Sequence, residues 1–385
     1  MLKLFRLTSV PLSLETLLKG QLCFMQQYYD VTAICSDRDR LRKVGENEGV
    51  KTFHVELTRQ ITPLKDFKAL WKLYQYFRKE KPDIVHTHTP KAGLIGMMAA
   101  SLANVPCRLH TVAGMPLMEA KGLKRIVLNF TEKLSYKCAN KVYPNSKGLY
   151  DFIINSKFCP KQKLKIIGNG SSNGIDTTYF SPSLYSSEQK QKLKNELNIP
   201  YNVFVFCFVG RLVKDKGINE LVQAFIEINT KYQNTKMLLV GPFEQELDPV
   251  SAETEKYIQE HPNIILVGFQ PDVRPYLAIS DIFVFPSYRE GFPNVVMQAG
   301  AMELPCIVTD INGCNEIIED GTNGLIIPSK NKEQLQEKMK LLIEDTGLRN
   351  HLKKNTRKMI TSRYEQKIVW ETLLREYKNL EDNLK

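Results

Sequence analysis

The chain has 385 residues, of which 43% are hydrophobic and 25% are charged, the composition of an ordinary globular protein. This length favours two domains over one, and the absence of low-complexity tracts excludes a largely disordered chain. No apolar stretch reaches the roughly 18–20 residues that cross a bilayer, which argues against an integral membrane protein. The eight cysteines form no C-x-x-C pair, so we expect reduced thiols and a cytoplasmic protein.

The net charge of +11 is unevenly distributed. Residues 1–170 carry 28 Lys and Arg against 13 Asp and Glu, a balance of +15, whereas residues 171–385 carry 25 against 29, a balance of −4. The basic half predicts an anionic partner, which the charge alone leaves open among a membrane surface, a nucleic acid and a phosphorylated substrate.

Apolar, β-branched runs alternate with helical patterns along almost the whole chain. Clear 3.6-residue periodicity marks helices at 64–81 and 217–232. The alternation predicts an α/β protein with parallel sheets covered by helices. The predicted strands span residues 2–9, 31–35, 51–55, 83–88, 107–112, 141–144, 164–168, 204–209, 236–240, 264–267, 281–285, 305–309 and 324–327.

Residues 168–185 interrupt this alternation, because they are rich in Gly, Asn, Ser and Pro and show no periodicity. They are predicted to link two doubly wound domains, 1–167 and 186–362. Ligands of open parallel sheets bind beyond the carboxyl ends of the strands, so two such domains facing each other would form a cleft. The linker contains G-x-G-x-x-x-G, but no helix follows it, which argues against a dinucleotide cofactor.

The segment "GRLVKDKG" places Arg211 and Lys216 between the strand at 204–209 and a helix. Arg supplies a bidentate fork, Lys a mobile point charge, and the helix N-terminus a favourable dipole. This combination suits a diphosphate, although solvated loop charges are the alternative interpretation.

The segment "YREGFPNVV" places a carboxylate, Glu290, in the loop after the strand at 281–285. A carboxylate accepts hydrogen bonds from vicinal hydroxyls, and Gly291 allows close backbone approach to a ligand. The loop backbone at Gly291, Phe292, Pro293 and Asn294 is expected to contact the donor sugar and phosphate, and its N–H groups, which proline lacks, to donate to hydroxyl or phosphate oxygens. A nucleotide sugar needs both functions, whereas the alternative is that Glu290 only caps the following helix.

Several motifs together resemble glycosyltransferase family 4: "GRL…KG", "SDIFVFPS…EGFPNVV", "LPCIVTDINGCNEII" and a central "NGID". The resemblance covers nearly the whole chain and implies the GT-B fold, in which two Rossmann-like domains face a central cleft. It also implies that a C-terminal helix, residues 363–385, crosses back to the N-terminal domain. The segments at 86–100 and 166–180 further resemble the bacterial subgroup that builds capsule, O-antigen and related glycans on a lipid-diphosphate carrier.

The resemblance implies a retaining glycosyltransferase that needs no metal ion and no cofactor. A hexose or N-acetylhexosamine would move from a UDP-sugar or other nucleotide sugar to a lipid-diphosphate-linked saccharide. Arg211 and Lys216 would bind the donor diphosphate, and Glu290 would act at the donor sugar. Family members usually carry a second Glu eight positions after the first, where this chain has Gln298, so ribose contact is expected in a weaker form.

Three of the six histidines lie near predicted strand ends. The resemblance implies that His110 begins a loop near the transferred sugar and takes part in catalysis. His86 and His88, expected on opposite faces of their strand, and Lys91 are candidates for the acceptor side. For His86 and His88, a buried, hydrogen-bonded imidazole is an equally good interpretation.

Two helical segments, 64–81 and 121–141, combine an apolar face with many lysines and arginines. A basic amphipathic helix can lie on an anionic membrane, so we expect peripheral association with the inner face of the cytoplasmic membrane. The alternative is that these helices only cover the N-terminal sheet.

Two other functions are weighed against glycosyl transfer. A sugar-nucleotide 2-epimerase would use similar diphosphate contacts but would show further acidic residues and histidines. A nucleic-acid-binding protein would cluster its basic residues among exposed aromatics, whereas here the lysines are dispersed along helices, so no nucleic-acid partner is expected.

Overall fold

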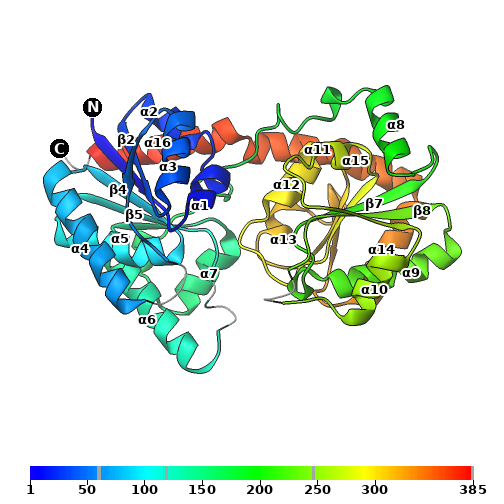
Figure 1. The fold of residues 1–385 in the computed structure, drawn as a ribbon, viewed down its shortest axis with the longest axis horizontal. Coiled ribbons are helices and arrows are strands. Elements are labelled where there is room, and N and C mark those ends of the chain that lie inside the picture. The colour runs from blue at the N-terminus through cyan, green and yellow to red at the C-terminus, as the bar shows by residue number, and fades with distance from the viewer. Residues whose placement is uncertain (59–61, 116, 118–119, 245–247, 383–385) are drawn as a thin grey trace. The chain divides into compact units, whose positions relative to one another are not determined.

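The computed structural model describes residues 1–58, 62–115, 117, 120–244 and 248–382 of the chain. It divides into two compact units, the first comprising Met1–Gly174 and Gln366–Lys385 and the second comprising Ile175–Glu365. Each unit contains a six-stranded parallel sheet with helices on its faces (Figure 1). The α/β, doubly wound fold predicted from the alternation of strands and helices is therefore confirmed.

The first sheet has the strand order β3-β2-β1-β4-β5-β6. All its neighbouring strands pair in parallel. The chain builds outward from β1 through β2 to β3, then returns to the other side of β1 with β4. The strands are β1 (Lys3–Leu7), β2 (Asp30–Cys35), β3 (Lys51–His54), β4 (Ile84–His88), β5 (Cys107–Val112) and β6 (Lys141–Pro144).

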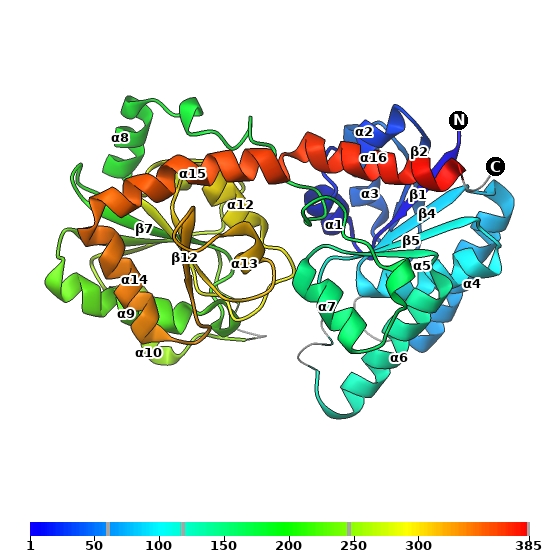
Figure 2. The same cartoon turned by 180° about the vertical axis from the view of Figure 1, so that it is seen from behind.

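Alternate residues of these strands enter two separate hydrophobic cores, because successive side chains of a strand point to opposite faces of the sheet. Leu4 and Ile84 belong to one core, and their neighbours Phe5 and Val85 belong to the other. The first core is covered by α1 (Pro11–Leu17), α2 (Gln21–Gln26), α3 (Arg38–Glu48) and α16 (Gln366–Asp382), and the second by α4 (Pro63–Glu80), α5 (Pro90–Leu102), α6 (Gly122–Cys138) and α7 (Lys147–Asn155) (Figure 2).

The second sheet has the order β12-β11-β10-β7-β8-β9 and is also parallel. Its strands are β7 (Phe204–Val209), β8 (Thr235–Val240), β9 (Ile264–Gly268), β10 (Ile282–Phe285), β11 (Cys306–Thr309) and β12 (Gly324–Ile327). Its α-helices are α8 (Ser187–Glu196), α9 (Ile218–Lys231), α10 (Ala252–Glu260), α11 (Arg274–Ala278), α12 (Asn294–Ala301), α13 (Cys314–Ile317), α14 (Lys332–Glu344) and α15 (Thr346–Tyr364). Short 3-10 turns lie at η2 (Lys161–Lys163), η3 (Pro182–Leu184) and η4 (Lys214–Lys216).

The strand predicted at 164–168 is wrong. Leu164 makes only an isolated bridge to Val142, and the chain then turns at Gly168 and Gly170, both of which have positive φ. Ile167 is buried in the core beneath α16, so this hydrophobic residue packs in the core and does not pair with a neighbouring strand.

The segment predicted as a linker, 168–185, contains bends and one short 3-10 turn. The boundary between the two units falls inside it, after Gly174, and the chain leaves the second unit again after Glu365. Helix α16 is part of the first unit, where Leu373, Leu374 and Tyr377 pack in its core. The first unit is thus assembled from both ends of the chain.

Candidate functional site

The second sheet reverses its winding direction between β7 and β10, which are neighbours in space. Strands β8 and β9 extend to one side of β7, and β11 and β12 extend to the other side of β10. Loops leaving the carboxyl ends of two such strands diverge, and the opening between them is the usual ligand site of a doubly wound sheet. Lys216 follows β7 and Glu290 follows β10, so the topology brings these two predicted residues to one place.

Lys216 and Glu290 form an ion pair, Nζ to Oε1. Their side chains are only 15% and 16% exposed, and the Lys216 ammonium also lies 5.7 Å from the centre of the Phe285 ring. The Ser287 hydroxyl donates a second hydrogen bond to Glu290 Oε1 over 3.0 Å. The alternative that Glu290 caps α12 is not what the structure shows, because the N-cap residue is Pro293 and it has no side-chain cap bond.

The loop that carries Glu290 is fixed by the neighbouring loop after β11. Asn312 Nδ2 donates to the carbonyl oxygens of Glu290 and Gly291 over 3.0 and 2.7 Å. A Cβ atom at Gly313 would lie 2.6 Å from the Gly291 carbonyl oxygen, so only glycine fits there. Two strand ends therefore hold the backbone on which the carboxylate sits.

The predicted contact loop leads directly into α12. Phe292 is buried and its ring packs 5.4 Å from that of Tyr364, while Asn294 is the first residue of the helix. Gln298 lies within α12 and is half-buried. The loop and helix are positioned as predicted, at the carboxyl edge of the sheet.

Arg211 lies at the same edge, since it follows β7, but it is paired differently. Its guanidinium forms an ion pair with Glu244, which follows β8, and its side chain is 49% exposed. The structure thus brings Lys216 and Glu290 into direct contact, and holds Arg211 on the adjoining loop.

Sequence reasoning missed several residues that shape this site. Arg289 Nη2 pairs with Asp215 Oδ2 over 2.6 Å, which ties the Glu290 loop to the 3-10 turn of Lys216. Ser287 and Asn312 fix the carboxylate and its backbone, as described above. The signal that would have found Asn312 is its position just beyond strand β11, in "TDINGC", at the same sheet edge as Glu290.

In the first unit, His110 lies inside β5 and not at the start of a loop. It is 2% exposed, its Nδ1 lies 2.8 Å from Thr87 Oγ1, and its ring faces α5. A Cβ atom at Gly93 would lie 2.3 Å from His110 Cε1, so the helix and the ring are in close contact. Burial lowers the pKa of His110 to about 4.

His86 and His88 lie on the same face of β4, and the expectation that they lie on opposite faces is wrong. Residues two apart in a strand share a face, and the two rings stack with centres 4.5 Å apart. His86 is held between Tyr377 Oη at 2.5 Å and Thr111 Oγ1 at 2.8 Å. Burial, and then the neighbouring positive groups, lower the pKa of both histidines well below the ordinary value.

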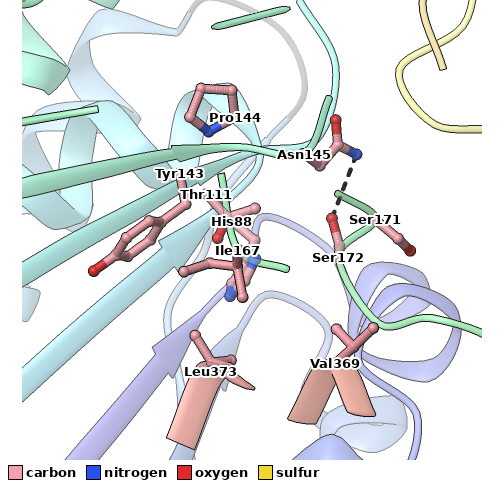
Figure 3. Close-up of a pocket in the computed structure, with 10 residues that line it drawn as sticks. All are labelled: His88, Thr111, Tyr143, Pro144, Asn145, Ile167, Ser171, Ser172, Val369 and Leu373. Atoms are coloured by element: carbon pink, nitrogen blue, oxygen red, sulfur yellow. Dashed lines mark hydrogen bonds between the residues drawn. The ribbon is translucent and has the colours of Figure 1, made fainter. Parts of the chain in front are cut away.

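Lys91, at the start of α5, does not join these histidines. Its ammonium bonds Asp66 Oδ1 at 2.8 Å and Thr58 Oγ1 at 3.0 Å. His88 instead lines a small cavity at the carboxyl ends of β4, β5 and β6 (Figure 3). The cavity is lined by His88, Thr111, Tyr143, Pro144, Asn145, Ile167, Ser171, Ser172, Val369 and Leu373.

Helices α4 and α6 cover the same face of the first sheet (Figure 1). Both helices expose large apolar side chains. In the described part of the chain, no helix is both long enough and apolar enough to cross a membrane. The exposed apolar residues, with their exposed fractions, are Leu64 (83%), Phe67 (66%) and Trp71 (53%) on α4, and Leu123 (76%), Ile126 (65%), Val127 (36%) and Phe130 (67%) on α6.

Comparison with known proteins covers both units. A model of the "Glycosyl transferase 4-like domain" matches residues 23–170, and one of "Glycosyl transferases group 1" matches residues 189–359. The chain is 36% identical to the capsular polysaccharide biosynthesis glycosyltransferase CapM of Staphylococcus aureus over 372 residues, 96% of this chain and 95% of the relative. It is 30% identical to the UDP-Gal:alpha-D-GlcNAc-diphosphoundecaprenol alpha-1,3-galactosyltransferase of Escherichia coli, over 87% of this chain and 85% of the relative.

Solved structures agree on the fold. The HepE protein of Anabaena, solved in complex with UDP, superposes with a TM-score of 0.80 at 19% identity, covering 98% of this chain and 100% of that one. With both domain models matched in order and a relative above one-third identity along nearly the full length, the chain belongs to the group 1 glycosyltransferases that carry a 4-like N-terminal domain and the GT-B fold.

Proposed function

We propose that the enzyme transfers a hexose or an N-acetylhexosamine from a UDP-sugar to a saccharide on a lipid-diphosphate carrier, as a step in bacterial surface glycan synthesis. The observation that carries the proposal is the Lys216–Glu290 pair at the point where the second sheet reverses direction. Two findings on similar proteins support the choice of substrates. The relative from Escherichia coli is named for a UDP-sugar donor and a diphosphoundecaprenol acceptor, and HepE was solved with UDP.

The donor chemistry follows from the charges at the site. When the bond between the anomeric carbon and the diphosphate breaks, negative charge grows on the departing nucleotide. Lys216 and Arg211 are the cations positioned to stabilise that charge, and fixed charges in a half-buried site act more strongly than in water. Glu290 accepts hydrogen bonds from the hydroxyls of the sugar, and Gln298 contacts the ribose. Lys216 leaves Glu290 when the diphosphate arrives, so the ion pair holds both side chains ready in the empty site.

The cations also underlie the proposal that no metal ion is needed, because they supply the charge that a divalent ion would otherwise supply. Retention of the anomeric configuration is proposed with it. The catalytic role of His110 stays a prediction. Its ring is buried between β5 and α5, so we propose that it acts on the transferred sugar indirectly, by positioning the end of β5 and the loop that follows.

The test is a panel of nucleotide sugars incubated with the protein, scored by thermal shift and by release of the nucleotide. We expect a UDP-sugar to raise the melting temperature and to be turned over in the presence of a lipid-diphosphate saccharide, with EDTA having no effect. Lys216→Ala should weaken the thermal shift, whereas Lys214→Ala, which removes an exposed lysine from the same 3-10 turn, should not. If no nucleotide sugar stabilises the protein, the proposal is wrong.

We further propose that α4 and α6 dock on an anionic membrane at the inner face of the cytoplasmic membrane, where the lipid-linked acceptor resides. Exposed lysines and arginines flank the apolar side chains of both helices, among them Lys68 and Lys72 on α4 and Lys124 and Arg125 on α6. Apolar residues that enter the headgroup region beside cations that contact acidic lipids are the features of an interfacial helix.

Flotation with vesicles tests the membrane contact. We expect the protein to float with phosphatidylglycerol vesicles at low salt, and neither with phosphatidylcholine vesicles nor at high salt, because surface charge is screened. Phe130→Ser with Trp71→Ser should reduce binding, whereas Tyr201→Ser, which removes an aromatic ring that is 77% exposed in the second unit, should not. If the Phe130→Ser, Trp71→Ser double variant binds the vesicles as well as Tyr201→Ser does, α4 and α6 do not form the membrane contact.

A further inference from the structure

Arg6, in the middle of β1, is wholly buried, and its bonding partners are all uncharged. Its Nη1 donates to Tyr377 Oη over 3.2 Å, and its Nη2 donates to Gln21 Oε1 over 2.5 Å and lies 2.9 Å from His88 Nε2. A buried charge is expensive unless an opposite charge compensates it, and guanidinium groups do not lose their proton. Within the described part of the chain, Arg6 makes no ion pair with a carboxylate.

The contact with Arg6 fixes the tautomer of His88. A guanidinium can only donate hydrogen bonds, so His88 Nε2 accepts from Arg6 and the proton of the neutral ring lies on Nδ1. That Nδ1 has no hydrogen-bond partner in the structure, although His88 is only 2% exposed. Since Nε2 is occupied, His88 cannot serve as a general base, and it presents a single donor backed by a positive charge.

The unpartnered Nδ1 belongs to a residue that lines the small cavity at the carboxyl edge of the first sheet (Figure 3). The cavity has a volume of about 20 Å³, room for one oxygen-sized atom. Asn145 also lines it, and its Oδ1 likewise lacks a partner, while its Nδ2 makes only long contacts of 3.4 and 3.5 Å. Hydroxyl groups of Thr111, Ser171 and Ser172 complete the polar wall, and none of the lining residues is acidic.

We propose that this cavity is a subsite for one anionic phosphoryl oxygen, bound by His88 Nδ1–H and compensated by the charge of Arg6. The position fits, because the cavity lies at the carboxyl ends of β4, β5 and β6, and ligands of parallel sheets bind at that edge. A sugar ring does not fit in this volume, whereas one oxygen of a phosphate does. The assignment of that oxygen to the diphosphate of the lipid-linked acceptor rests on the proposed function; the phosphoryl-binding property of the cavity does not.

Histidine NMR on the full chain tests the subsite. The protein is labelled with 15N-histidine and saturated with UDP, so that the site in the second unit is filled, and is then titrated with inorganic pyrophosphate. We expect the His88 resonances to show a proton on Nδ1 and to shift saturably with pyrophosphate. The resonances of His261, in the second unit, should not move and serve as the internal control.

Two substitutions of His88 separate the hydrogen-bond donor at Nδ1 from the contact between Nε2 and Arg6. The amide nitrogen of Asn occupies about the position of Nδ1, and the end of a Gln side chain that of Nε2. His88→Asn should therefore retain pyrophosphate binding within a few fold, and His88→Gln should weaken it at least tenfold. Both variants should keep the thermal shift with the UDP-sugar, so failure of the subsite is distinguishable from failure of the donor site.

Several results would overturn the subsite. They are a proton on Nε2 of His88, no shift of the His88 resonances with pyrophosphate, a pyrophosphate affinity of His88→Gln equal to that of the wild type by calorimetry, or a shift that disappears in Lys216→Ala, which would place the anion in the second unit. Unchanged resonances would mean that the cavity holds only a trapped water. A raised KM for the diphosphate acceptor in His88→Gln, with the KM for the donor unchanged, identifies the acceptor as the source of the oxygen. Pyrophosphate binding with unchanged transfer kinetics identifies a free anion instead.

Discussion

At the scale of single residues, the proposed donor site is organised by one ion pair. Lys216 and Glu290 neutralise each other, and the proposed function gives each a second task, Lys216 at the diphosphate and Glu290 at the sugar. The Ser287 hydroxyl also donates to Glu290, and under the proposed function this bond would hold the carboxylate in position when Lys216 turns to the diphosphate. The pair therefore limits the cost of keeping two charges half-buried in the empty enzyme.

Glu290→Gln separates these two tasks. The amide cannot neutralise Lys216, so the ammonium is left free for the diphosphate, and we expect the affinity for UDP to be equal to or higher than that of the wild type. Transfer should fall by about 100-fold, the usual loss when one hydrogen-bonding group at a reacting centre is removed. Calorimetry with UDP and a transfer assay measure the two effects. Transfer at the wild-type rate would remove Glu290 from the sugar site.

The residues of this site were partly predictable. Lys216, Glu290 and the loop to Asn294 could be predicted because strand–loop–helix patterns place them at one sheet edge. The ion pair itself was not predictable, since its members are 74 positions apart and charge patterns do not specify partners. The placement of His110 depended on locating a strand end by resemblance, and a shift of two residues moves a side chain from a loop into a core.

At the scale of elements, α5 packs very closely against the first sheet. Its face toward the sheet carries Gly93 and Gly96, where a Cβ atom would lie 2.3 Å from His110 and from Leu7 respectively. The helix therefore lies close to the strands, and its buried residues include Ala92, Ile95, Met97, Ala99 and Ala100.

Gly93→Ala should destabilise the first unit by about 1–3 kcal/mol, because the added methyl group displaces a ring in a filled core. Urea denaturation measures the loss. Gly347→Ala is the matched control, since Gly347 is an exposed residue in α15, and alanine there should be neutral or stabilising by up to about 1 kcal/mol. Equal stability of Gly93→Ala and the wild type would mean that α5 can move away from β5.

The periodicity of α4 and α6 predicted amphipathic helices but did not predict which way they face. Leu73 and Phe77 of α4 are buried, whereas Leu64, Phe67 and Trp71 of the same helix are exposed. Such a helix carries more apolar residues than its contact with the sheet can bury. The same apolar periodicity is therefore compatible with more than one orientation of the helix. Packing against α5 decides the orientation, and the sequence does not encode it locally.

At the scale of the whole molecule, we expect the two units to differ in how they respond to acid. The first contains His86, His88 and His110, all buried, and burial lowers the pKa of each, that of His110 to about 4. An unfolded histidine binds a proton near pH 6.5, so between about pH 6.5 and 4 the unfolded state binds more protons than the folded state. The stability that these groups contribute is present above pH 6.5 and is lost as the pH falls through that range.

We expect the first unit to lose about 2 kcal/mol between pH 7 and pH 5 through His110 alone, with further losses from His86 and His88. Denaturant unfolding at the two pH values, followed by probes in each unit, measures the change. An unfolding free energy of the first unit that does not depend on pH in this range would show that these rings are accessible to protons in the folded state.

The two-sheet fold was predictable because strand–helix alternation determines it. The path of the chain at its C-terminus was implied only by the resemblance to known glycosyltransferases. The side chain that makes α16 part of the first unit, Tyr377, bonds His86 and Arg6, which lie in strands near the other end of the sequence. Local patterns carry no information on a contact between residues 371 positions apart.

This arrangement has a consequence for biosynthesis. Tyr377 and Leu373 are translated after the whole of the second unit, and until then Arg6 and His86 each lack one of their hydrogen-bonding partners and one face of their sheet lacks part of its cover. The second unit, whose chain is contiguous from Ile175 to Glu365, can complete its core while synthesis continues. The first unit is therefore completed only after the second unit has been translated, and a nascent chain that stops before α16 would offer an unfinished first unit to chaperones and proteases.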